Sequence, residues 1–149
     1  MRLASASLVF TAILTSTVSA QPTACQLVTA SEMAAILGTE VGTAADDRGI
    51  QTKCTYEPAQ AELGGPFAEL QVNWGDGHAS MAGAGAMKPQ LGAVMDDLDG
   101  LGDQATSVGP MTMIRRGEDL ITLVVSGVPD NTAAIKGIYK VLDERLASQ

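Results

Sequence analysis

The chain contains two cysteines, Cys25 and Cys54, and their surroundings place them in two different kinds of element. Cys25 comes just before a segment with the signals of a short helix. Cys54 lies within a segment whose apolar and polar residues alternate, as they do in a strand with one buried face. A covalent bond between the two would hold a helix against a sheet and stabilise the fold by about 3–4 kcal/mol.

Residues 1–20 have the pattern of a secretory signal peptide. Arg2 provides the positive start, residues 8–14 form the apolar region, and Val18-Ser19-Ala20 provides the small-residue cleavage site. The apolar region is too short to span a bilayer. We therefore expect residues 21–149 to form a single domain in the periplasm or outside the cell, with no membrane span.

In an exported chain, two cysteines are most simply explained by one disulfide, and we predict the bond Cys25–Cys54. A redox pair and a metal site are the alternatives. A redox pair would usually have Cys-x-x-Cys spacing, and a metal site needs more ligands than the single histidine offers. Lipidation of Cys25 would need a Leu-Ala-Gly type of site before it, where the chain has Pro-Thr-Ala.

The helix after Cys25 is marked at both ends. Thr29 and Glu32 have the spacing of a capping box, in which each residue satisfies a backbone N–H of the other. Gly38 follows Leu37, where a left-handed residue commonly ends a helix. We interpret Glu32 as a capping residue, with a catalytic acid or a ligand as the alternative.

Periodicity predicts the remaining elements. Strands are expected at 50–57, 67–74, 111–116 and 120–126, and helices at 87–98 and from 130 to about 146. Residues 39–49 form a polar connector with room for a short edge strand, and 79–86 fit either a helix or a loop. The predicted fold class is α+β, with an antiparallel sheet of about four to five strands, helices covering one face and the order α-β-β-α-β-β-α.

Charge limits the choice of partners. Removing residues 1–20 removes Arg2 and no acidic residue, so residues 21–149 hold eight basic and seventeen acidic residues, a formal charge of −9. Such a balance argues against nucleic acid and against anionic membrane surfaces. We expect a monomer whose partner is an envelope protein or a small ligand.

A search for catalytic chemistry yields one weak alternative, an exported hydrolase that would use His78, Asp76 and Ser80. Residues adjacent in one turn rarely form a triad, and the chain has no Gly-x-Ser-x-Gly nucleophile elbow. We therefore predict a non-catalytic domain without catalytic, cofactor-binding or metal-binding residues. If it binds a small ligand, the open face of the sheet is the expected site, with Gln71, Asn73, Thr112 and Arg115 as its candidate residues.

Two loop features partly match known binding motifs. The acidic residues Asp96, Asp97, Asp99 and Asp103 match only part of a calcium loop, so solvated turn carboxylates are the simpler interpretation and weak calcium binding the alternative. Residues 100–105 lack the third glycine of a dinucleotide loop and the lysine of a P-loop. Their glycines are expected to serve a turn.

Several short motifs together suggest a family. They are Cys25-x-Leu-Val-Thr-x-x-Glu32, Leu37-Gly38, Cys54-Thr-Tyr56, Gly100-Leu-Gly-Asp-x-Ala105 and the Arg-Arg-Gly-Glu-Asp-Leu hairpin. The chain resembles, over most of 25–146, exported domains of unknown function that are common among actinobacterial lipoproteins, and the outer sensor part of some receptor kinases. The resemblance implies a small α+β fold with a disulfide between the paired cysteines, and it implies no catalytic residues.

Overall fold

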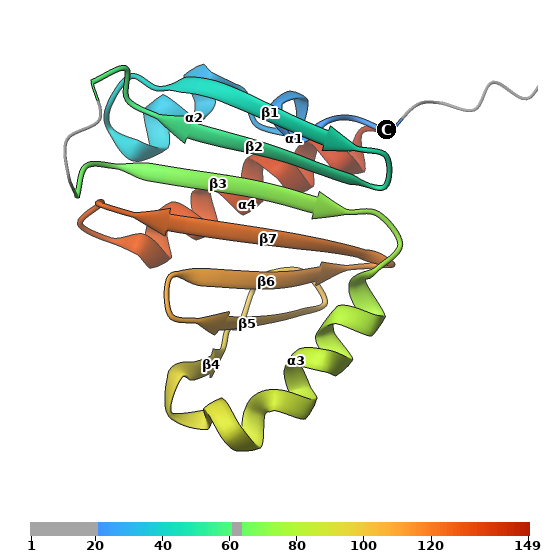
Figure 1. Cartoon of the computed structure of the whole chain (residues 1–149). Coiled ribbons are helices and arrows are strands. Elements are labelled where there is room, and N and C mark those ends of the chain that lie inside the picture. Colours follow the sequence, from blue (N-terminus) through green and yellow to red (C-terminus); the bar gives the residue numbers. More distant parts are fainter. Residues whose placement is uncertain (1–20, 61–63) are drawn as a thin grey trace, which may run out of the picture.

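The computed structural model describes residues 21–60 and 64–149, which form one antiparallel sheet with helices on both sides (Figure 1). The seven strands lie in the order β1-β2-β3-β7-β6-β5-β4. Their bounds are β1 Gly42–Arg48, β2 Gln51–Glu57, β3 Phe67–Asn73, β4 Met95–Asp97, β5 Gln104–Val108, β6 Met111–Arg116 and β7 Asp119–Ser126. The predicted signal peptide, residues 1–20, and residues 61–63 of the turn between β2 and β3 lie outside the described residues.

The helices divide between the two faces of the sheet. Their bounds are α1 Ala24–Leu27, α2 Ala30–Leu37, α3 Gly77–Leu91, the short 3-10 helix η1 Gly92–Val94 and α4 Asn131–Ala147. Figure 1 shows α1, α2 and α4 behind the sheet, whereas α3 descends from the end of β3 beside β6, β5 and β4. The α+β class is confirmed, but the predicted four to five strands and the placement of all helices on one face are wrong.

The main core lies between the sheet and α1, α2 and α4. The alternation of side chains along the strands creates this core, because every second residue of β2, β3 and β7 points to this face and is buried. Its largest fully buried side chains are Tyr56, Leu27, Met33, Leu70, Ile114, Ile121, Leu123, Ile138 and Leu142. The nearly continuous apolar run of β7 predicts a central strand, and β7 is the fourth of the seven strands.

At the edges of the sheet two strand predictions are wrong, and the expected edge strand is present but longer than predicted. Ile50 is not on the buried face of β2 but in the turn after Gly49, where it is 69% exposed. The glycine has φ +67°, so the chain reverses there and the strand begins one residue later than predicted. The polar connector contains a full seven-residue edge strand, β1, and the glycine loop leads into a strand, β5, that alternation alone did not reveal.

The predicted helix at 87–98 is also wrong. Only residues 87–91 of that prediction belong to α3, which begins ten residues earlier; Gly92–Val94 form η1, and Met95–Asp97 form the edge strand β4. Pro89 lies in the last turn of α3, where its ring nitrogen cannot donate to a carbonyl one turn earlier, and the helix ends two residues later. The alanine-rich segment 79–86 is helical because alanine favours a helix strongly enough to offset Gly83 and Gly85.

The N-terminal segment is fastened to β2 by covalent and polar contacts. A disulfide joins Cys25 to Cys54, as predicted, with the two Cα atoms 5.0 Å apart. The N–H of Ala24 donates to Thr52 Oγ1 at 2.8 Å, and the hydroxyl of Tyr56 donates to the carbonyl of Val28 at 2.6 Å. Burial raises the pKa of the Tyr56 phenol well above its usual range, so the phenol remains a donor.

The capping box of α2 is confirmed, and it also binds the last helix. The N–H of Thr29 donates to Glu32 Oε2 at 2.8 Å, and Arg145 of α4 donates to Glu32 Oε1 at 2.7 Å. The same guanidinium donates to the carbonyl of Leu27 at 2.7 Å. The hydrogen bond from Arg145 is the main reason that the pKa of Glu32 falls to about 2.

We predict that removing the disulfide with C25A/C54A lowers the free energy of unfolding by about 3–4 kcal/mol, because the bond closes a loop of 29 residues. Urea unfolding of both proteins measures the difference. Wild-type protein held in a reductant is the control and should match the double variant. Equal stability of the oxidised and reduced wild type would contradict the prediction, as would two free thiols in the mass spectrum of the protein purified without reductant.

We predict that Glu32→Gln lowers the free energy of unfolding by about 1–2 kcal/mol at pH 7, after allowance for solvent screening of this partly exposed pair. The pKa of Glu32 is lower in the folded than in the unfolded protein. Its contribution is therefore complete above about pH 4.5 and is lost as the pH falls through about 2. Urea unfolding at several pH values should show the two proteins converging in acid. A constant difference between pH 7 and pH 2 would disprove this origin.

Candidate functional site

One face of the sheet is left uncovered by α1, α2 and α4. On its β1–β2–β3–β7 part the side chains are mostly polar, and they pair with one another. Lys53 Nζ lies 3.4 Å from Glu69 Oε2, and Gln71 Nε2 donates to Asn73 Oδ1 at 3.2 Å. Two predicted ligand-face residues, Gln71 and Asn73, therefore lie on the face that the sequence analysis intended.

The other two predicted ligand-face residues are engaged in the fold itself, one by burial and the other by hydrogen bonds. Thr112 points to the opposite face of β6, beneath the helices, and is 1% exposed, so its inclusion was wrong. Arg115 shares the uncovered face but is engaged with the loop before β5. Its guanidinium donates to Asp103 Oδ2 at 3.2 Å and to the carbonyl of Gly117 at 3.1 Å.

The remaining part of the uncovered face carries a pocket of about 320 Å³ between α3 and strands β4, β5 and β6. Its wall is almost entirely apolar, and four of its members are methionines. The lining residues are Ser80, Gly83, Ala84, Met87, Leu91, Met95, Val108, Met111 and Met113. We call it the methionine pocket. It has the properties of a small-molecule site, a concave apolar cavity at the boundary between a helix and a sheet.

Small residues bring α3 close enough to form this pocket. A Cβ on Gly77 would lie 2.6 Å from the carbonyl oxygen of Asp119, so glycine is needed where α3 begins against the β6–β7 turn. The N–H of Gly77 donates to the carbonyl of Glu118 at 2.8 Å. Further along α3, Gly83 and Ala84 line the cavity and leave its volume free for the longer side chains of the strands.

The methionine pocket was not predicted from the sequence. Met87, Leu91 and Met95 matched the period of one helix, whereas the structure places the last of them on a strand. The available signal was composition, because most methionines of the chain lie between residues 81 and 113. Their convergence depends on strand β4 pairing with β5, which no local pattern indicates.

The residues of the hydrolase alternative are near one another but are not arranged as a relay. The hydroxyl of Ser80 donates directly to Asp76 Oδ2 at 2.6 Å. His78 is instead paired with Glu118, with Nε2 and Oε1 3.3 Å apart, and it is well exposed. In a catalytic triad, the histidine lies between the hydroxyl and the carboxylate.

Two of the four clustered aspartates are held by cationic side chains. Asp97 pairs with Lys88 of α3, and Asp103 pairs with Arg115 while accepting from the N–H of Gly117 at 2.7 Å. Within residues 21–60 and 64–149, no group of three or more His, Cys, Asp or Glu side chains is placed to hold a metal ion. The carboxylate of Asp103 thus organises a turn, which the sequence analysis had treated as solvated.

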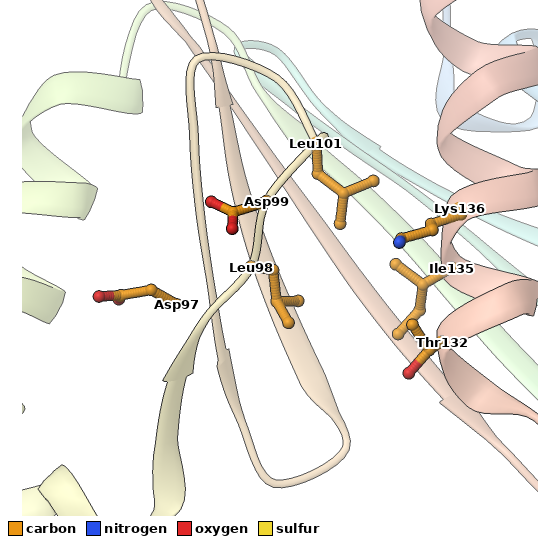
Figure 2. Close-up of a pocket in the computed structure, with 7 residues that line it drawn as sticks. All are labelled: Asp97, Leu98, Asp99, Leu101, Thr132, Ile135 and Lys136. Atoms are coloured by element: carbon orange, nitrogen blue, oxygen red, sulfur yellow. The ribbon is translucent and has the colours of Figure 1, made fainter.

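A second, smaller pocket of about 180 Å³ lies between the β4–β5 connection and α4 (Figure 2). Leu101 and Ile135 face one another across it, whereas Asp97 points away. Leu101 and Ile135 are themselves buried in the main core. This pocket is therefore a surface depression at the margin of the main core, and its polar side chains do not point toward a common position.

Comparison of the chain with protein-family models, with curated proteins and with solved structures finds no match. The resemblance to exported actinobacterial domains therefore stays a prediction. Of the helices that the structure describes, none combines the length and the apolar character that crossing a membrane requires. The disulfide is compatible with an extracellular location.

We predict that Asp103→Asn lowers the free energy of unfolding by about 1–2 kcal/mol, because a charge-assisted acceptor for Arg115 and for the N–H of Gly117 is lost. Thermal or urea unfolding measures the effect. Asp99→Asn, which removes an exposed carboxylate of the same loop, is the matched control and should change stability by less than about 0.5 kcal/mol. Equal effects of the two substitutions would show that Asp103 does not organise the turn.

Proposed function

We propose that this protein is an exported, non-catalytic binding domain whose binding site is the methionine pocket. The observation that carries the proposal is the pocket itself, because it joins an apolar cavity to an uncovered sheet face. The disulfide and the closely packed main core supply a rigid support for this site. The partner is a small ligand, and an envelope protein that docks on the neighbouring sheet face is compatible with the same site.

The register of the sheet connects the pocket with the polar part of the face. Met113 of β6 is paired with Thr122 of β7, which is paired with Gln71 of β3. Neighbouring strands are about 4.8 Å apart, so Gln71 lies about 10 Å from Met113 along this row. An occupant of the pocket would therefore be next to hydroxyl and amide groups without any rearrangement of the backbone.

Side-chain burial separates the pocket from the main core. Met81, Ala84, Met95 and Leu120 are buried but do not belong to the core cluster beneath α4. Met87 is 53% exposed, although a buried position would be favourable for so apolar a side chain. An apolar wall with an exposed methionine at its margin is the kind of surface that adaptable binding proteins use.

We predict that an uncharged aromatic probe, N-phenylnaphthylamine, binds this pocket. With methionine methyl groups labelled with carbon-13, the probe should shift the signals of Met87 and Met113. The signal of Met33 should stay unchanged, because that residue is fully buried on the other side of the sheet.

Ala84→Phe should weaken probe binding at least tenfold, because the added ring occupies the cavity that Ala84 lines. Ala35→Phe is the matched control, since Ala35 is exposed on α2 on the far side of the sheet. Both variants are first checked for folding by circular dichroism. Binding that Ala84→Phe leaves unchanged would overturn the assignment of the pocket, and an exported-hydrolase activity that His78→Ala abolishes would overturn the non-catalytic proposal.

A further inference from the structure

The distribution of methionine in the chain is uneven in space. Six methionines lie in residues 21–149, and Met33 alone belongs to the main core. The other five lie on α3, β4 and β6, and four of them line the methionine pocket. A requirement for apolar filling could be met by leucine, isoleucine or valine, which supply most of the main core. The methionine pocket is therefore distinguished from the main core by its cluster of thioether sulfur atoms.

The strand register directs three of these thioethers to one face. Met111 and Met113 are two residues apart on β6 and point to the same side of the sheet. Val108 of β5 is paired with Met111, and Met95 of β4 is paired with Val108. The side chain of Met95 therefore emerges two strands away from Met111, on the same side, with the smaller valine between them.

Helix α3, which packs on the same face of the sheet, contributes the fourth thioether. Met87 lies near the end of α3 and lines the same pocket while remaining 53% exposed. The pocket holds about 320 Å³ of free space, and the side chains of all four methionines line it. Four flexible thioether side chains from three elements thus surround one open cavity.

We infer that the methionine pocket binds a soft monovalent cation of the Cu(I) or Ag(I) type through methionine thioethers. Thioether sulfur is a soft, neutral ligand, which favours Cu(I) and does not suit Mg²⁺, Ca²⁺ or Zn²⁺. No carboxylate, imidazole or thiol is among the residues that line the pocket, and its one side-chain oxygen, the Ser80 hydroxyl, is hydrogen-bonded to Asp76, so the wall offers harder cations few ligands.

Two further properties of the chain favour a cation with this chemistry. Both cysteines are joined in the disulfide, so the methionine thioethers are the sulfur atoms of the described chain that do not belong to an S–S bond. The formal charge of residues 21–149 is strongly negative, as counted above, and attracts cations to the protein. This inference rests on the proposed function, since it names the class of ligand that the same pocket takes.

The test is a titration of the disulfide-bonded protein with Ag(I), and with Cu(I) in competition with a chromophoric Cu(I) chelator, followed by native mass spectrometry. We expect one ion per chain and no displacement by a tenfold excess of Zn²⁺.

Met87→Leu combined with Met113→Leu keeps the apolar volume but removes two sulfurs, and should weaken binding at least tenfold. Met33→Leu removes a sulfur from the main core and should leave binding unchanged. In carbon-13 spectra, the ion should shift the methyl signals of the pocket methionines and not that of Met33.

The outcomes distinguish a failure of the soft-cation inference from a failure of the proposed binding site. Absence of binding, or equal binding by the double leucine variant, would overturn the soft-cation inference. The single variant Met87→Leu, at an exposed position, gives the same comparison if the double variant does not fold. Probe binding without ion binding would leave the proposed function standing and remove this inference alone. If neither the probe nor the ion binds, both the proposed function and the soft-cation inference are overturned.

Discussion

The attachment of the N-terminal segment to β2 is the constraint on which the remaining architecture depends. A one-turn helix and a two-turn helix are too short to be stable alone. Here the disulfide, the Ala24–Thr52 hydrogen bond and the Tyr56–Val28 hydrogen bond act within a few residues of one another. Because these contacts fix α1 and α2 on the sheet, Arg145 of α4 finds a preformed group of acceptors.

Arg145 illustrates how one side chain connects distant parts of the chain. Its guanidinium binds the carbonyl groups at the end of α1 and the carboxylate of Glu32 at the start of α2. The end of a short helix exposes carbonyl oxygens that need donors, and the next helix begins with an acidic capping residue. One cation therefore binds the free carbonyl groups at the end of α1 and the capping carboxylate of α2, and it orients the last helix over the sheet.

Local signals predicted the parts of the fold that have local causes. The capping box, the end of α2 at Gly38, the start of α4 at Asp130 and the central position of β7 all follow from short patterns, and the structure has each of them. The failures concern elements with weak patterns. β4 contains three residues and depends on its partner β5, and β1 is held by pairing with β2 although its side chains are mostly exposed.

The candidate site was predicted less well than the fold. The open face was expected, and Gln71 and Asn73 lie on it, but Thr112 points the other way and Arg115 is occupied by Asp103. The methionine pocket arises from the packing of α3 against the three neighbouring strands β6, β5 and β4 at one edge of the sheet. A hydrophobic period of 3.6 residues cannot distinguish a helix stripe from residues that a helix and a strand bring together.

Strand β1 has a consequence for the behaviour of the protein at high concentration. Its outer edge is unpaired, and an unpaired edge can template the addition of a strand from another molecule. Asp46, Asp47 and Arg48 lie at the end of this strand, and Asp46 and Arg48 form an ion pair there. A second copy would have to desolvate these charges and bring like carboxylates together. The edge is thereby protected against the edge-to-edge addition of strands by which fibrils grow.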